Sequence, residues 1–139
     1  MRDELRNRCN RIEECYEFML AYAAQGLPGD KGSPSGGELR TFLTRCDESL
    51  VGLAEVFTRI VEQEGWQPAD RYHAFIAVLD RDAQDARAAV QLVLAQASIS
   101  SQLIDNLNAS IHVRALLTDL FLIDEIVRPQ GITEGSKVL

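Results

Sequence analysis

Residues 72–97 read YHAFIAVLDRDAQDARAAVQLVLAQA, and the apolar side chains in this stretch recur at intervals of three and four residues. This spacing places them on one face of an α-helix, which has about 3.6 residues per turn. Alanines in the middle of the face would let a neighbouring helix approach closely. The stretch therefore predicts an amphipathic helix, and Pro68 just before it suits a first helical turn because its missing amide hydrogen would be unpaired there. The face comprises Tyr72, Phe75, Ile76, Leu79, Ala83, Ala86, Val90, Val93, Leu94 and Ala97.

The same periodicity extends to three other stretches, residues 5–23, 39–60 and 103–127. Each predicts one further amphipathic helix. Four helices of this kind joined by short connections favour antiparallel neighbours. We therefore expect an all-α fold, a four-helix up-down bundle that is oligomeric.

One long Gly/Pro loop is expected between the first two helices, because residues 26–37 carry five glycines and two prolines. The tetrapeptide Ser35-Gly36-Gly37-Glu38 matches a capping box and predicts that the second helix begins there. The loop lacks the spacing of a phosphate-binding loop, since Lys31 precedes Gly32 and no strand precedes the loop. We interpret it as a flexible connector.

The boundary between the last two predicted helices depends on Ser98, Ser100 and Ser101, residues that can cap a helix but do not forbid one. A tight turn at 98–101 would give two helices similar in length to the second. The alternative is one unbroken helix from Pro68 to Val127, which would need a partner chain to cover it.

Length and charge limit the possible classes of protein. The 139 residues are enough for one domain, expected at residues 1–128 and followed by a flexible tail at 129–139. The net charge of −7 makes the protein acidic. Nucleic acid is not an expected partner, because its phosphates would be repelled. No window approaches the roughly 20 apolar residues of a membrane span, so we expect no membrane association and a cytoplasmic location.

Neither catalysis nor metal binding is predicted by any cluster of residues. The chain has two histidines and no Glu-x-x-His pair, so a di-metal carboxylate site is not expected, and no nucleophile has a recognisable base. We predict no catalytic residues, no metal site and no cofactor.

The alternative hypothesis is a bundle that encloses a small ligand or a cofactor such as haem or a metal. Its candidate lining residues are Tyr16, Trp66, Tyr72, His73, His112 and Arg114.

The second half of the last helix carries more apolar residues than one bundle face can bury. A peripheral helix needs an apolar stripe of only about 100°, so the surplus indicates a second burial partner. The expected interface residues are Leu116, Leu117, Leu120, Phe121, Ile123 and Val127. The sequence therefore favours a non-enzymatic interaction protein, a scaffold, adaptor or other accessory protein that docks a protein partner or self-associates, with a homodimer preferred.

Two contacts follow from pairing neighbouring helices as antiparallel hairpins. Cys15 and Cys46 should lie close together, as reduced thiols, where the first two helices cross. Arg114 should form a partly buried ion pair with Asp85 across the last two helices.

Overall fold

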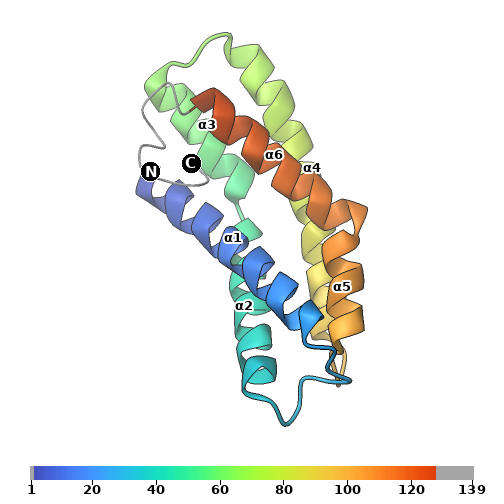
Figure 1. Cartoon of the computed structure of the whole chain (residues 1–139). Helices are drawn as coiled ribbons and strands as arrows, with labels where there is room; N and C mark the ends of the chain where they lie inside the picture. The colour runs from blue at the N-terminus through green and yellow to red at the C-terminus, as the bar shows by residue number, and fades with distance from the viewer. Residues whose placement is uncertain (1, 128–139) are drawn as a thin grey trace.

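The computed structural model describes residues 2–127, and within them the chain forms six α-helices and no strand (Figure 1). The prediction of an all-α fold is confirmed, whereas the expected count of four helices is wrong for the described residues. None of the helices described is long and apolar enough to cross a membrane. The tail predicted at 129–139 lies outside the described residues. The helices are α1 (Arg2–Ala24), α2 (Pro34–Leu50), α3 (Leu53–Glu64), α4 (Ala69–Leu94), α5 (Ser101–Ala109) and α6 (Ile111–Val127).

The helix expected over residues 39–60 is broken into α2 and α3. Val51 is extended, with φ −69° and ψ 118°, and Gly52 has a left-handed backbone with φ 74°. Glycine adopts this conformation without the steric cost that a Cβ atom imposes. The apolar periodicity continues across the break, so the pattern alone predicts one helix where the backbone forms two.

The last predicted helix is also broken, into α5 and α6. Ser110 is extended, with ψ 147°, and its Oγ accepts a hydrogen bond from the Val113 amide at 3.3 Å. A serine hydroxyl that accepts a hydrogen bond from an otherwise unpaired amide at a helix start lowers the free-energy cost of such an interruption.

A turn is present where one was predicted at 98–101, although it begins three residues earlier than expected, and the single helix from Pro68 to Val127 is excluded. Helix α4 ends at Leu94, and Ser100 caps α5 by accepting a hydrogen bond from the Leu103 amide at 3.0 Å. Consecutive helices therefore fold back on one another within one chain.

The start of α2 differs from the expected capping box. The capping residue is Ser33, whose Oγ accepts a hydrogen bond from the Gly36 amide at 3.0 Å, and Pro34 occupies the first turn. Proline suits that position because its nitrogen carries no hydrogen that would need a partner. The Ser35 hydroxyl instead donates to Gln25 Oε1 at 2.8 Å.

The preceding loop is anchored, contrary to its interpretation as a flexible connector. Asp30 is buried and accepts hydrogen bonds from Arg40 Nε at 2.6 Å and from the Ile99 amide at 2.7 Å. The Tyr22 hydroxyl donates to the Ile99 carbonyl at 2.7 Å. These bonds tie the loop to α1, α2 and the α4–α5 turn.

The helices form an elongated bundle in which α2 and α5 lie toward one end and α3 and α6 toward the other, while the long helices α1 and α4 extend along both (Figure 1). One apolar core runs through all six helices and includes Tyr22, Leu43, Phe57, Leu79, Ile104 and Leu116. Each fully buried side chain of this size contributes about 1.5–3 kcal/mol. The predicted proximity of Cys15 and Cys46 is confirmed, because the two buried, unpaired thiols share a hydrogen bond.

Candidate binding site

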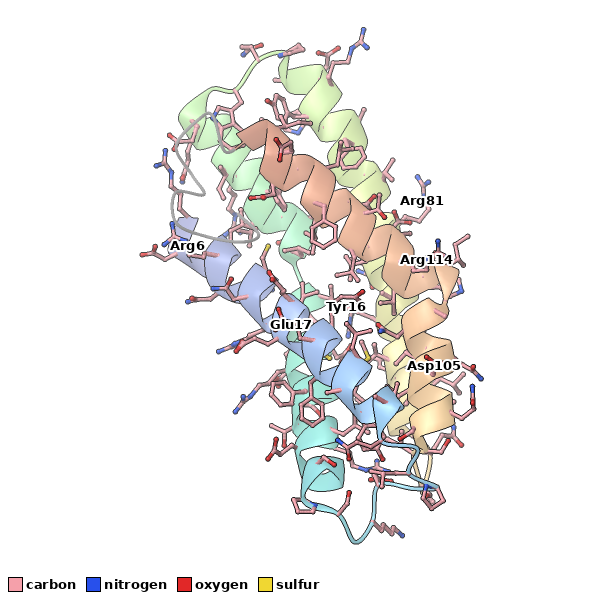
Figure 2. All side chains as sticks on the ribbon, in the orientation of Figure 1. Arg6, Tyr16, Glu17, Arg81, Asp105 and Arg114 are labelled. Carbon is pink, nitrogen blue, oxygen red and sulfur yellow. The ribbon has the colours of Figure 1, made fainter. Side chains whose placement is uncertain are left out.

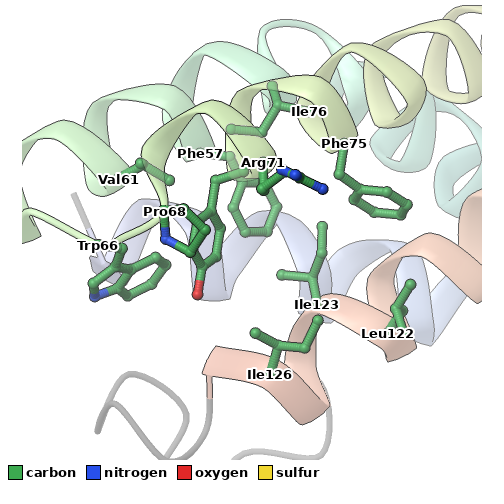
Figure 3. A pocket seen from close by; sticks show the side chains of 11 residues that line it. Phe57, Val61, Trp66, Pro68, Arg71, Phe75, Ile76, Leu122, Ile123 and Ile126 are labelled. Carbon is green, nitrogen blue, oxygen red and sulfur yellow. The ribbon is translucent and has the colours of Figure 1, made fainter.

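An apolar pocket of about 350 Å³ lies between α3, α4 and α6 (Figure 3). A second hollow, of about 490 Å³, lies where α1 ends beside α5, but its lining mixes apolar residues such as Leu20 and Leu27 with polar ones such as Gln102 and Asp105. The first pocket is therefore the better candidate site. Its lining residues are Phe57, Val61, Trp66, Pro68, Arg71, Tyr72, Phe75, Ile76, Leu122, Ile123 and Ile126.

The turn from α3 to α4 forms one end of the pocket. Gly65 ends α3 in a left-handed conformation with φ 66°, and the Trp66 amide donates to the Val61 carbonyl at 3.2 Å. This reversal, a common use of glycine after a helix, turns the Trp66 side chain inward. Trp66 is buried, and the centroid of its ring lies 5.7 Å from that of Tyr72.

Helix α6 forms the opposite side of the pocket and leaves part of its apolar surface in contact with solvent. Ile123 is buried against α3 and α4, whereas Leu122 and Ile126 are each 48% exposed. Their neighbour Phe121 is 51% exposed. We call Phe121, Leu122 and Ile126 the α6 patch. The pocket therefore opens beside an apolar surface.

Among residues 2–127, Arg71 is the only charged residue that lines the pocket. Its Nε lies 3.9 Å from a carboxylate oxygen of Asp70, and both side chains are 83% exposed. An ion pair so long and so exposed to water is worth about 0–1 kcal/mol. The guanidinium thus keeps most of its capacity to bind another anion.

The six interface residues predicted from the sequence differ in how far they are exposed to solvent. Leu116, Leu117, Leu120 and Ile123 are buried in the core of their own chain, so they present no surface to a partner in this fold. Phe121 is half-exposed. The side chain of Val127 lies outside what the structure describes.

The prediction from sequence missed two residues of the α6 patch, Leu122 and Ile126. Their i, i+4 spacing places them on one helix face, but Leu120, Phe121, Ile123 and Val127 beside them are equally apolar. No local signal separates the exposed face from the buried one where nearly every residue is hydrophobic. The difference in exposure between the two faces of α6 depends on how this helix packs against α3 and α4.

Only two of the candidate ligand-lining residues, Trp66 and Tyr72, contribute to the pocket. His73 is exposed on α4 and His112 on α6. Tyr16 lies half-buried on α1 and Arg114 is exposed on α6, far from the pocket (Figure 2). The structure therefore does not bring the six candidates into one site.

The predicted ion pair between Arg114 and Asp85 is wrong, because neither residue forms an ion pair within the described part of the chain. Instead, the carboxyl groups of Asp82 on α4 and Asp119 on α6 lie close enough to influence each other. Asp119 is buried, and its Oδ2 atom has no hydrogen-bond partner. Burial first, and then the neighbouring carboxyl group of Asp82, raise the pKa of Asp119 to about 7.

Residues 2–127 contain no group of three or more histidine, cysteine, aspartate or glutamate side chains that could hold a metal ion. No protein-family model, curated protein or solved structure matches the chain. The geometry of the molecule itself defines its class: an all-helical protein with one open apolar pocket and an exposed apolar patch beside it.

Proposed function

We propose that the chain is a non-enzymatic interaction protein, of the scaffold or adaptor type, that forms a homodimer through the α6 patch. The observation that carries this proposal is the clustering of three half-exposed apolar side chains within six residues of one helix. Exposed apolar residues that are scattered singly are ordinary, whereas a contiguous group beside an apolar pocket is typical of an interaction surface.

The composition of the patch supports tight packing between two protein surfaces. Phe121 supplies an aromatic side chain, a residue type that is enriched in the centres of interfaces. Full burial of a Leu, Ile or Phe side chain contributes about 1.5–3 kcal/mol, so covering the exposed half of each patch residue would contribute about 1 kcal/mol. Two copies of the patch meeting across a twofold axis would double this gain.

The charge of the chain opposes self-association and gives it a recognisable salt dependence. Each copy carries a net charge of −7, and Glu125 is exposed between Leu122 and Ile126 in the sequence. Two copies repel each other at long range, and dissolved salt screens this repulsion. A dimer held by apolar contact should therefore become tighter as the salt concentration rises.

The test is to measure the mass of the protein by sedimentation over a wide range of concentration, for the wild type, Phe121→Asp and Ile111→Asp. Ile111 is a matched control because it is an apolar residue of the same helix, is 73% exposed and lies outside the patch. We expect a dimer for the wild type and Ile111→Asp. Phe121→Asp should weaken association by at least about tenfold, because it places a charge in the interface.

Circular dichroism should give the same helix content for all three proteins, since both substituted side chains are exposed. A wild type that sediments as one chain at every concentration would overturn the proposal. Equal effects of Phe121→Asp and Ile111→Asp would also overturn it, because the patch would then not be the contact.

A further inference from the structure

We propose that the pocket between α3, α4 and α6 binds a small amphiphile with one apolar chain and one carboxylate. The apolar chain would lie between α4 and α6, and the carboxylate would meet Arg71 at the rim. This inference goes beyond dimer formation. It concerns the pocket as a single chain forms it, because Leu122 and Ile126 belong both to the pocket lining and to the α6 patch.

The walls of the pocket select an apolar ligand. Four aromatic rings and the aliphatic side chains of α6 surround the space, and Arg71 is the one charged side chain that the described part of the chain adds to this lining. The rings are those of Phe57, Trp66, Tyr72 and Phe75. A polar ligand would lose its hydration without gaining enough hydrogen bonds to replace it. An alkyl chain has no hydrogen bonds to water to lose, and its binding removes apolar surface from water.

The size of the pocket selects a single chain of moderate length. Small-molecule sites span about 300–1,000 Å³, and the volume of about 350 Å³ lies at the lower end of that range. A flat macrocycle or a two-chain lipid needs more room. In the single chain, the half-exposed Leu122 and Ile126 leave the rim of the pocket open to solvent, where the head group of the ligand would lie.

Arg71 selects the head group. Figure 3 shows its side chain beside Phe75 on the α4 side of the pocket, across from Leu122 and Ile126 of α6. Arginine binds a carboxylate through two parallel N–H donors, and Asp70 at 3.9 Å engages the guanidinium only loosely. A carboxylate on a chain seated in the pocket would lie at the rim, where these donors are.

Because the chain as a whole is negatively charged, tighter binding of an anionic ligand than of a neutral one would point to Arg71. A chain of net charge −7 repels anions at long range. A ligand that binds better with a carboxylate than with a neutral head group must therefore owe its preference to a local cation.

Trp66 provides a direct readout, because it is the only tryptophan of the chain and lines the pocket. The experiment titrates the full chain with decanoate and with decanol, below the concentrations at which they aggregate, and follows Trp66 fluorescence and heat release. Arg71→Gln removes the proposed head-group contact. Arg81→Gln is the matched control, an exposed arginine of the same helix that lies away from the pocket (Figure 2).

We expect decanoate to change the Trp66 emission saturably and to bind more tightly than decanol. Arg71→Gln should weaken decanoate binding by about three- to tenfold and leave decanol binding unchanged, the size of effect typical of one charge-assisted contact near the surface. Arg81→Gln should behave as the wild type. The Phe121→Asp variant should bind decanoate normally, since Phe121 does not line the pocket, which separates this site from the dimer contact.

Three results would overturn the inference. One is the absence of any change in Trp66 emission and of any heat below the aggregation limit of decanoate. Another is an equal loss of decanoate affinity in Arg71→Gln and Arg81→Gln. The third is loss of decanoate binding in Phe121→Asp, which would mean that one chain does not hold the site.

Discussion

At the scale of single residues, the buried Asp119 is the most unusual group in the molecule. Its carboxyl lies between α4 and α6, close to that of Asp82, and its Oδ2 atom has no hydrogen-bond partner. Such an acid is best accommodated in its neutral form, because burial and a neighbouring carboxylate both penalise the charge. The contact between α4 and α6 therefore depends on the protonation of one side chain.

This arrangement predicts that stability falls as the pH rises. The folded pKa of about 7 lies above the usual value of 3.8, so the folded state binds the proton more tightly than the unfolded state does. Below pH 3.8, Asp119 is protonated in both the folded and the unfolded state, so its burial carries no cost of burying a charge. Between about pH 4 and pH 7 the unfolded state loses the proton more readily, and the free energy of unfolding should decline. Asp119→Asn, which cannot ionise, should remove this decline and stabilise the protein by about 1–3 kcal/mol at pH 8.

Urea denaturation of the wild type and Asp119→Asn at pH 4.5 and pH 8 measures the difference. Asp105→Asn, at an exposed position on α5, serves as the control and should leave the pH dependence unchanged (Figure 2). A wild type equally stable at the two pH values would contradict the role assigned to Asp119.

Asp30 shows the opposite behaviour at the same scale. The hydrogen bond from Arg40 is the largest influence on its carboxyl, the Ile99 amide adds to it, and together they lower the pKa to about 2 against the opposing effect of burial. A lowered folded pKa contributes stability that is complete well above pH 3.8 and is lost as the pH falls toward 2. Asp30→Asn should cost about 1–3 kcal/mol at pH 7, because Arg40 loses its charged partner and the loop loses its anchor.

Thermal unfolding at pH 7 and at pH 2.5 tests this expectation, with Asp105→Asn again as the exposed control. The destabilisation caused by Asp30→Asn should be clear at pH 7 and much smaller at pH 2.5. An equal loss at both values would indicate that packing, and not the ion pair, sets the cost.

At the scale of elements, the break between α2 and α3 depends on one residue. Gly52 has φ 74°, a conformation that costs an L-amino acid roughly 1–2 kcal/mol. Helix α3, which begins directly after this break, supplies Phe57 and Val61 to the pocket. A glycine inside an apolar repeat thus helps to position the candidate site.

Gly52→Ala is accordingly expected to destabilise the protein by about 1 kcal/mol. Gly37→Ala is the matched comparison, because Gly37 lies within α2, has no positive φ and would place its new Cβ in open space. That substitution should stabilise the helix by up to about 1 kcal/mol. Differential scanning calorimetry of both variants checks the opposite signs, and stabilisation by Gly52→Ala would contradict the left-handed assignment.

At the scale of the whole molecule, the two ends of the bundle differ in their contacts. One end is tied together by the hydrogen bonds of Asp30, Arg40 and Ser101, and Arg40 also donates to the Leu94 and Gln96 carbonyls where α4 ends. The end formed by α3 and α6 has the pocket and the α6 patch. Binding of a ligand and of a second copy are therefore both proposed at the same end.

Periodicity alone was sufficient to predict an all-helical chain, because the three-to-four-residue repeat of apolar side chains is a local property of each segment. Pairing neighbouring helices as hairpins also predicted the contact of Cys15 with Cys46. The turn after α4 was predicted from the serines at 98–101 and from the lengths of the helices on either side. The same pattern could not show where residues 39–60 and 103–127 break, since Gly52 and Ser110 interrupt the backbone without interrupting the apolar repeat. Nor could it distinguish Leu120, buried in the core, from Leu122, half-exposed beside the pocket. That distinction depends on which neighbouring helices cover each face of α6, and burial is set by contacts between segments distant in the chain.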